Sequence, residues 1–238
     1  MSETFQFNLP LLQAAQAQKH VTVNEALTRL DAVAQLRLVS DAETVPPLSA
    51  LEGTAYSVPN GAVNAWDGHI GEIAVFVNGG WVFMTPKTGW KAWIESISDS
   101  AVFDGNIWQP RVVAMTASGA STAFHMIEFD HVITPGATNT TTVNIEGSML
   151  VFGVTGRIKQ AISGTGLTGW KMGVSGMENR YGDPHSTAQG AWIRALTGTP
   201  VVYYGAEPLV LSALGGDFIS GEIKLVIHGL LFQYPANI

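Results

Sequence analysis

The chain contains no cysteine among its 238 residues, which excludes disulfide bonds, thiolate metal sites and cysteine nucleophiles. A protein without cysteine is indifferent to redox state, which suits one that is made in the cytosol and works outside the cell. Charged side chains are also scarce, at 13% of the residues against about 25% in an average soluble protein. Because 46% of the residues are hydrophobic, the balance is opposite to that of a disordered chain, and we expect a folded protein.

Basic side chains are too few to suggest a polyanionic partner. Twelve Lys and Arg stand against 19 Asp and Glu, the net charge is −7, and no basic run occurs. Proteins that bind the phosphate backbone of nucleic acids do so through clustered Lys and Arg, which this chain lacks, so we expect no nucleic-acid partner. Every apolar stretch is interrupted before it reaches 18 residues, so we expect no membrane insertion. The start, Met1-Ser2-Glu3-Thr4, has neither a basic nor an apolar region, so we expect no signal peptide.

The shortage of charge also bears on quaternary structure. A 25.3 kDa chain with so few charged side chains must expose apolar surface unless other chains cover it. We therefore interpret the protein as a subunit of a homo-oligomer. The alternative is a monomeric β protein whose surface is rich in Thr, Ser and Asn.

The first forty residues predict a helical segment. Thr22 and Glu25 have the spacing of a capping box, in which each side chain satisfies a free amide at a helix start. An apolar stripe with helical spacing follows, formed by Val23, Ala26, Leu27, Leu30, Val33 and Ala34. We predict a helix from about Val23 to Leu38, with a short Ala/Gln-rich helix possible over Leu11–Lys19.

The rest of the chain predicts β structure. The strands Ile73–Val77 and Trp81–Met84 flank Asn78-Gly79, and Asp104-Gly105 separates residues 101–103 from 106–108 in the same way. Residues 117–122 are all small and suggest a linker. Beyond them we predict eight short strands, near residues 123–129, 141–145, 149–155, 170–174, 191–196, 201–204, 209–213 and 223–232.

Together these patterns predict a mainly β fold in three parts. The parts are a short N-terminal helical segment (1–40), a small Trp-rich β-hairpin domain (41–116) and a C-terminal antiparallel, jelly-roll-like β-sandwich (117–238). Residues 164–169 match G-x-G-x-x-G, but a strand-like segment follows where a dinucleotide site needs a helix, so we expect no cofactor. The six histidines are scattered, so we expect no metal site.

The densest group of polar side chains lies between Met177 and His185. It contains Glu178, Asn179, Arg180, Tyr181, Asp183 and His185. Loops on rigid scaffolds often carry function, so we take this group as a glycan-binding candidate; the alternative is a solvated surface loop. Indole rings can stack on the flat C–H faces of sugars. The tryptophans added to the candidate site are Trp90, Trp93, Trp170 and Trp192. Trp90 and Trp93 have opposite strand parity, so one of them is a candidate for exposure.

The most specific motif is Gln16-Ala17-Gln18-Lys19-His20-Val21-Thr22-Val23-Asn24-Glu25-Ala26-Leu27, with Pro10-Leu11-Leu12 before it and Leu30-Asp31 after it. Glycine and tryptophan positions continue the pattern to Trp108. Over residues 8–110 the chain resembles a phage-associated family, a domain of unknown function common in alphaproteobacterial prophages and gene-transfer-agent clusters. The chain from Met149 onward looks like the second half of longer family members.

The resemblance implies a virion structural protein, such as a head spike or fibre, that is made in the host cytoplasm and released by lysis. It implies a homo-oligomer, trimeric or pentameric, that contacts other virion proteins and binds host cell-surface polysaccharide. The helical segment would attach it, with assembly residues Gln18, Lys19, His20, Asn24 and Glu25. No catalytic residues are implied, so we expect no enzyme. Two alternatives stay open: a polysaccharide depolymerase whose carboxylate pair includes Glu178 or Asp183, and a purely structural connector.

Overall fold

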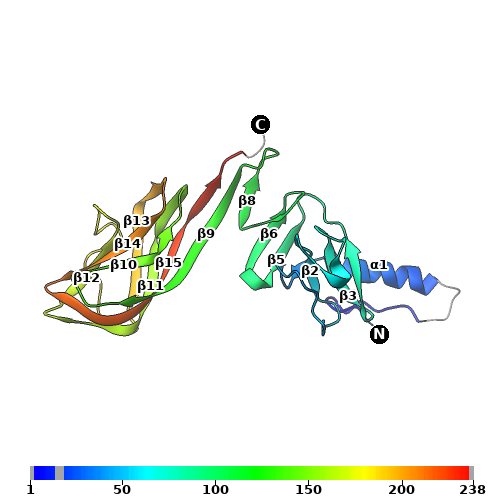
Figure 1. Cartoon of the computed structure of the whole chain (residues 1–238), viewed down its shortest axis with the longest axis horizontal. Coiled ribbons are helices and arrows are strands. Elements are labelled where there is room, and N and C mark those ends of the chain that lie inside the picture. Colours follow the sequence, from blue (N-terminus) through cyan, green and yellow to red (C-terminus); the bar gives the residue numbers. More distant parts are fainter. Residues whose placement is uncertain (1–2, 14–18, 236–238) are drawn as a thin grey trace. The chain divides into compact units, whose positions relative to one another are not determined.

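The structure is a computed structural model that describes residues 3–13 and 19–235, and the chain forms two compact units, residues 1–112 and 113–238 (Figure 1). The described part is mainly β, with one α-helix near the N-terminus, as the sequence predicts. The helical segment and the hairpin region, which the sequence treats as separate parts, share the first unit. No described helix has the length and apolarity that crossing a membrane requires.

The first unit contains one helix and two small sheets. Strands β1, β5, β6 and β7 form one sheet in that order, and β2, β3 and β4 form the other. The elements are α1 (Lys19–Val33), β1 (Arg37–Leu38), β2 (Ala55–Ser57), β3 (Ile73–Val77), β4 (Gly80–Met84), β5 (Lys91–Ile94), β6 (Asp99–Phe103) and β7 (Trp108–Pro110), with short 3-10 helices at Asn64–Trp66 and Glu95–Ile97. A core shared by both sheets includes Leu36, Leu38, Ile73, Val75, Ile94, Phe103 and Trp108.

The helix begins and ends earlier than predicted. Gln35 has a φ of 58°, the left-handed conformation that commonly terminates a helix. After it, Leu36 and Leu38 are buried and alternate with exposed Arg37, so they follow the two-residue period of a strand. The capping-box prediction is also wrong. Glu25 lies inside the helix, where its carboxylate pairs with Arg29 one turn later (2.8 Å).

The predicted hairpin at Asn78-Gly79 is confirmed. Both residues have positive φ, 53° and 76°, as the tight turn between β3 and β4 requires. The second turn is longer than predicted. The Asp104 side chain accepts hydrogen bonds from the backbone N–H groups of Asn106 and Ile107, so β7 starts only at Trp108.

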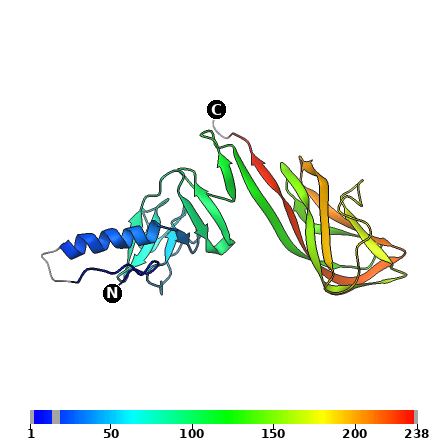
Figure 2. The same cartoon turned by 180° about the vertical axis from the view of Figure 1, so that it is seen from behind.

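The second unit is an antiparallel β-sandwich, as predicted (Figure 2). Its larger sheet has the order β13-β11-β15-β9-β8 and its smaller sheet the order β10-β14-β12. The strands are β8 (Val112–Met115), β9 (Ser121–Ile133), β10 (Thr138–Ile145), β11 (Met149–Thr165), β12 (Gly169–Gly173), β13 (Trp192–Tyr203), β14 (Glu207–Leu214) and β15 (Asp217–Gln233). One core fills the space between the sheets and includes Ile145, Val151, Val154, Trp170, Met172, Leu211, Ile223 and Leu225.

The strand order follows jelly-roll topology. In an eight-stranded jelly roll, one sheet has the strand order 1-8-3-6. In the other sheet, strand 2 pairs with strand 7. Counting from β9, the pairs β9–β15, β15–β11, β11–β13 and β10–β14 fit this rule. The β12–β14 pair completes the smaller sheet and leaves the outer side of β12 for a fifth element.

Most predicted strands of this unit lie in observed ones. The two predicted at residues 191–196 and 201–204 are parts of one strand, β13, whose pairing with β11 shifts register between them. The predicted linker is instead the turn between β8 and β9, closed by a hydrogen bond from the Thr116 N–H to the Ala120 carbonyl (2.8 Å). The G-x-G-x-x-G stretch spans the end of β11 and the start of β12, with no helix following it.

Candidate binding surfaces

The polar segment between Met177 and His185 takes the fifth place in the jelly roll. Its backbone pairs with the outer side of β12: Tyr181 donates to the Met172 carbonyl (2.7 Å), Met172 to Gly182 (3.1 Å) and His185 to Trp170 (2.7 Å). Three backbone hydrogen bonds tie it to the smaller sheet. The segment is therefore part of the sandwich rather than a free loop.

The aromatic members of this candidate glycan site belong to the core. Trp170 and Tyr181 are both fully buried, and the Trp170 indole N–H donates to the Ser186 carbonyl (2.7 Å). The Tyr181 hydroxyl is hydrogen-bonded to that of Tyr203 (2.8 Å), and burial raises the pKa of Tyr181 far above its ordinary value. Neither ring offers a face to a sugar, so we correct their assignment from ligand binding to packing.

His185 also serves the fold. Its ring lies 4.6 Å from the Trp170 ring, and its Nε2 atom is 2.8 Å from the Tyr181 carbonyl oxygen. Burial lowers the pKa of His185, so the ring is neutral at neutral pH. The remaining polar residues stay at the surface: Asn179 and Asp183 are exposed, and Glu178 and Arg180 are half-buried. Of the six residues that the sequence grouped together, Tyr181 is buried in the core and the half-buried His185 ring packs against Trp170.

The other three candidate tryptophans belong to other elements: Trp90 and Trp93 to the first unit and Trp192 to β13. Trp90 packs against the core of the first unit, whereas Trp93 is 47% exposed, so Trp93 is the outward one of the pair. Trp93 lies between Arg37 and Ser100 in the register of β1, β5 and β6. Trp192 is 62% exposed on β13, and the Arg157 guanidinium lies 4.5 Å from the centre of its ring.

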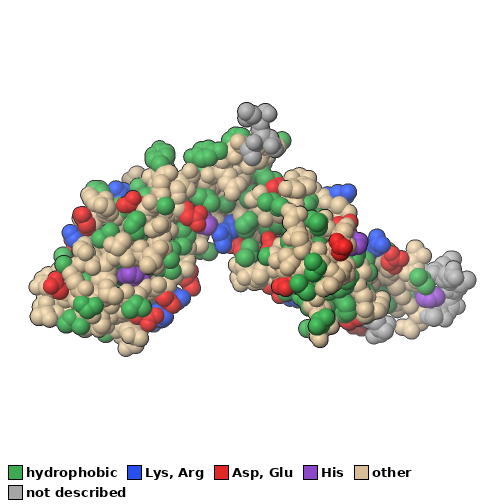
Figure 3. Space-filling view, viewed as in Figure 1, with side chains coloured by type: hydrophobic (Ala, Val, Ile, Leu, Met, Phe, Trp, Pro, Cys, Tyr) green, Lys and Arg blue, Asp and Glu red, His purple; other side chains and the backbone are tan. Residues whose placement is uncertain are grey.

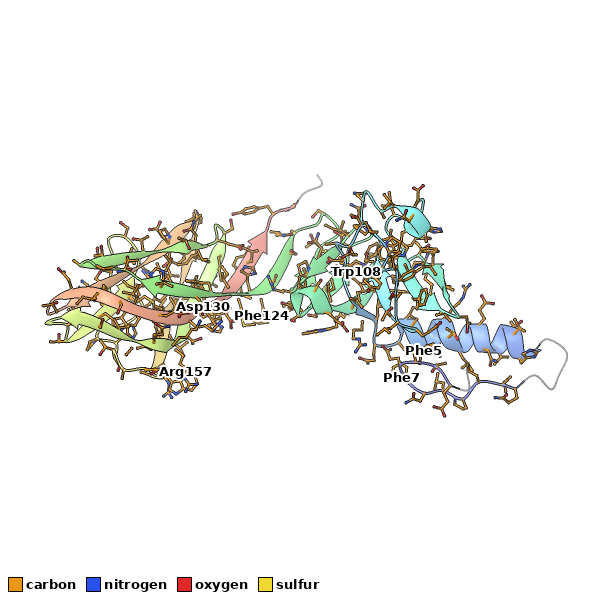
Figure 4. The ribbon with its side chains drawn as sticks, turned by 60° about the horizontal axis from the view of Figure 1, so that its bottom comes forward. Phe5, Phe7, Trp108, Phe124, Asp130 and Arg157 are labelled. Carbon is orange, nitrogen blue, oxygen red and sulfur yellow. The ribbon has the colours of Figure 1, made fainter. Side chains whose placement is uncertain are left out.

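Trp192 belongs to a polar half of the outer face of the large sheet. One row crosses four strands in register, from Asp130 through Lys224 and Arg157 to Trp192. Lys224 contacts the Asp130 carboxylate (3.3 Å), and Lys159 contacts it from the other side (2.9 Å). The hydrogen bond from Lys159 lowers the pKa of Asp130, which therefore stays ionised. Figure 4 labels Asp130 on β9 and Arg157 on β11.

The other half of the same face is apolar. One row runs from Phe124 through Leu230 and Leu150 to Val202. The next row runs from Met126 through His228 and Gly153 to Leu196, so one imidazole lies within this otherwise apolar half. We call the apolar patch the outward side chains Phe124, Met126, Leu150, Leu196, Val202, Leu230 and Phe232. Phe124 and Met126 are each 60% exposed, and Leu196 is 71% exposed. Figure 3 shows how much of the visible surface is hydrophobic or uncharged.

The predicted assembly residues lie on and around α1. Asn24 holds an N-terminal arm, residues 3–12, because its side chain accepts from the Leu12 N–H (2.8 Å) and donates to the Leu12 carbonyl (3.0 Å). His20, Asn24 and Glu25 line a groove of about 490 Å³ between α1 and the β3–β4 hairpin. Lys19 begins the helix, and Gln18 lies outside the described residues.

Asp31, which the sequence analysis quoted only as part of the motif, holds the arm against the helix. It is 5% exposed, and its carboxylate accepts hydrogen bonds from the Thr4 hydroxyl (2.6 Å) and from the N–H groups of Gln6 and Phe7 (both 2.8 Å). Asn24 and Asp31 are seven residues apart and so lie on one side of the helix. Phe5 and Phe7 are labelled beside α1 in Figure 4. The sequence signal that could have indicated this role is the acidic residue Asp31, which directly follows Leu30 in the family motif.

The predicted apolar stripe of the helix is not its buried side. Leu30 is 54% exposed, and Val23 is exposed as well, while the polar side that carries Asp31 faces the arm. The spacing of apolar residues thus predicted the presence of the helix but not which of its sides is buried. Within residues 3–13 and 19–235, no cluster of three or more His, Asp or Glu side chains could hold a metal ion.

Comparisons with known proteins found one family model and a weak structural likeness. A family model described as a protein of unknown function (DUF2793) matches residues 23–109, which lies within the stretch that resembles the phage-associated family. A chain in the solved "Cyanophage Pam1 capsid asymmetric unit" is similar at 19% identity, over 47% of this chain and 84% of that one, with a TM-score of 0.32. No curated protein matches the chain. The family model thus covers α1 from Val23 through the start of β7.

Proposed function

We propose that this protein is a structural component of a phage-related virion and that its sandwich binds polysaccharide on the host cell surface. The virion role is supported by the motif resemblance over residues 8–110, within which the family model matches residues 23–109. A low-charge, cysteine-free β-sandwich suits a particle component that works outside the cell. The binding role needs a surface with both stacking and polar groups.

The observation that carries the binding role is the pair formed by Trp192 and Arg157. The ring stays 62% exposed although the guanidinium lies over it, so an uncovered part of the indole is available for stacking on a sugar. The cation–π contact holds the guanidinium in place, and guanidinium groups pair bidentately with carboxylates. Lys224 and ionised Asp130 continue the row and can bond sugar hydroxyls. These groups favour an acidic polysaccharide.

The test compares Trp192→Ala with Trp93→Ala on immobilised host capsular polysaccharide, measured by biolayer interferometry. Truncating an aromatic anchor at the centre of a binding site typically weakens binding by about tenfold or more. We expect that loss for Trp192→Ala and little change for Trp93→Ala, which removes an exposed tryptophan from the other unit. Weaker binding by Trp93→Ala, with unchanged binding by Trp192→Ala, would indicate a site on the first unit instead.

Two further measurements separate the alternatives. A reducing-end assay on the same polysaccharide detects cleavage, and new reducing ends would favour a depolymerase. Mass spectrometry of purified particles tests the virion role, because a structural component must be present in every particle. Presence in particles without any polysaccharide binding would indicate a connector.

A further inference from the structure

We propose that the free edge of β4, together with the groove between α1 and the β3–β4 hairpin, binds an extended, uncharged segment of another protein. The segment adds a strand to the sheet of β2, β3 and β4 and places apolar side chains into the groove at every second residue. This inference rests on the proposed virion role, because that role supplies the partner protein, and it does not depend on polysaccharide binding.

The backbone of β4 has one side without a partner in the first unit. On β3, Phe76 accepts from the Gly53 N–H (2.8 Å) and donates to the Thr54 carbonyl (2.9 Å), so its backbone points toward β2. Phe76 is paired with Trp81, so the backbone of Trp81 points away from β3, and that of Phe83, two residues later, points the same way. Within the first unit, no hydrogen bond between described residues reaches these backbone groups from the outer side. Two N–H groups and two carbonyls are therefore open, at the two-residue spacing of a strand.

The opposite edge of this sheet is closed, and β4 lacks the features that usually protect an open edge. The Ser57 N–H of β2 donates to the Ser40 carbonyl (3.0 Å). Edge strands commonly carry a charged residue, a proline or a bulge, which prevent pairing with another chain. Accordingly, β7 contains Pro110, and the pairings of β10 and β13 shift register. In contrast, β4 (Gly80–Met84) contains neither charge nor proline and pairs with β3 without a shift.

The groove lies beside this edge because α1 lies over β3. Val75 and Val77 of β3 line a cavity on each side of the helix. The cavity on one side also contacts Ala55 of β2, and the cavity on the other side contacts Val82 and Met84 of β4. This second cavity is the groove of about 490 Å³. A strand paired with β4 lies along the groove, and every second side chain of that strand points toward α1 and enters it.

The lining of the groove determines the chemistry of the segment. Four apolar side chains of β3 and β4 form its floor, and Val21 of the helix wall is 55% exposed. Glu25 and Arg29 pair with each other (2.8 Å), so together they bring no net charge to the groove. Uncharged apolar side chains therefore fit it better than charged ones. Strand addition takes affinity from backbone hydrogen bonds and specificity from pockets for alternate side chains, and β4 and the groove offer both.

The first experiment tests whether the edge is open, by amide hydrogen exchange of the full chain. The amides of Val82 and Met84 face β3 and should be protected, whereas those of Trp81 and Phe83 should exchange at least about tenfold faster. Equal protection of all four amides in dilute protein would overturn the proposal, because the edge would already be covered. Protection of Trp81 and Phe83 that rises with protein concentration would place a second copy at the edge and would overturn it as well.

The second experiment measures binding of overlapping 15-residue peptides to the full chain by biolayer interferometry. The peptides are taken from the other proteins of purified particles. We expect at least one to bind and to protect the amides of Trp81 and Phe83. Methylating its backbone nitrogens one at a time should weaken binding by about tenfold at alternate residues and little at the residues between, because only alternate N–H groups face β4. Absence of binding by every peptide, or equal losses at successive residues, would overturn the proposal.

A matched pair of variants tests the groove. Val21 and Val23 lie near the start of α1 and are both exposed (55% and 41%), but Val21 lines the groove and Val23 does not. Val21→Glu should weaken peptide binding by about tenfold or more, because an apolar side chain of the segment would bury the new carboxylate. Val23→Glu should leave binding unchanged. Similar affinities for both variants would overturn the role of the groove, and far-UV circular dichroism checks that both are folded.

Failure of this inference and failure of the proposed function give different results. Mass spectrometry of particles made with each variant should find Val23→Glu and should find Val21→Glu greatly reduced. Absence of the unmodified chain from particles would contradict the virion role itself. Equal incorporation of both variants would contradict only the docking of a strand at β4. Val21→Glu should bind polysaccharide as the unmodified chain does, since Trp192 lies on the other unit.

Discussion

Replacing Asp31 by Ala should release the N-terminal arm from α1 without unfolding the first unit. The carboxylate holds the arm through the Thr4 hydroxyl and the N–H groups of Gln6 and Phe7. The Gln6 side-chain amide also donates to the Asp31 and Ala34 carbonyls at the helix end. Besides the exposed Asn24 contacts at Leu12, this buried carboxylate is the main anchor of the arm, since Phe5, Gln6 and Phe7 are exposed.

The size of the effect follows from the burial of the three bonds. A hydrogen bond to a charged group contributes about 1.5–3 kcal/mol, and the Thr4 bond is buried and keeps that value. Gln6 and Phe7 are exposed, so water partly replaces the carboxylate at their amides when it is removed. We estimate a total of about 3 kcal/mol, which corresponds to roughly a hundredfold increase in the opening of the arm.

Amide hydrogen exchange measures this opening directly, since it reports local unfolding residue by residue. The Gln6 and Phe7 amides should lose about a hundredfold protection in Asp31→Ala, while the amides of β3 and β4 keep theirs. The control is Asn24→Ala, which removes two exposed neutral bonds to Leu12 and should cost only about tenfold at that residue. Unchanged protection at Gln6 and Phe7 in Asp31→Ala would refute the reasoning.

Two further perturbations address the sandwich. Burial lowers the pKa of His131 below its ordinary value near 6.5, so the unfolded chain takes up the proton first as the pH falls. The melting temperature should therefore decline below about pH 6.5, and less steeply in His131→Leu; equal slopes in both proteins would show that this residue is not responsible. In Gly156→Ala the new methyl group would overlap the Lys224 carbonyl oxygen of the neighbouring strand, which should destabilise the unit by about 1–3 kcal/mol in urea unfolding. Gly198→Ala, with open space around it, should change stability by no more than about 0.5 kcal/mol, and similar losses in both variants would contradict the steric explanation.

Some features of this protein follow from the sequence because local rules decide them. The tight turn at Asn78-Gly79 needs only two residues that tolerate positive φ, and both neighbouring strands were predicted to within one residue. The alternation from Ile223 to His228 fixes which side chains face the core, because successive side chains of a strand point to opposite faces. The fold class was predicted from short strands separated by turn residues, which are local patterns of the same kind.

Other features depend on which distant segments meet, and only the tertiary structure decides them. The sequence predicted Trp170 and Tyr181 to be part of a binding surface. In the structure the segment around Tyr181 pairs with β12, and both rings are buried. The helix stripe at Leu30 was expected inside, yet the carboxylate of Asp31 and the arm occupy the packed side. The patch at Phe124 exists only because β9 pairs with β15, a hundred residues further along at Ile127 and Ile227. A sequence pattern reports the period of an element, whereas burial of a given side depends on long-range pairing that the pattern does not contain.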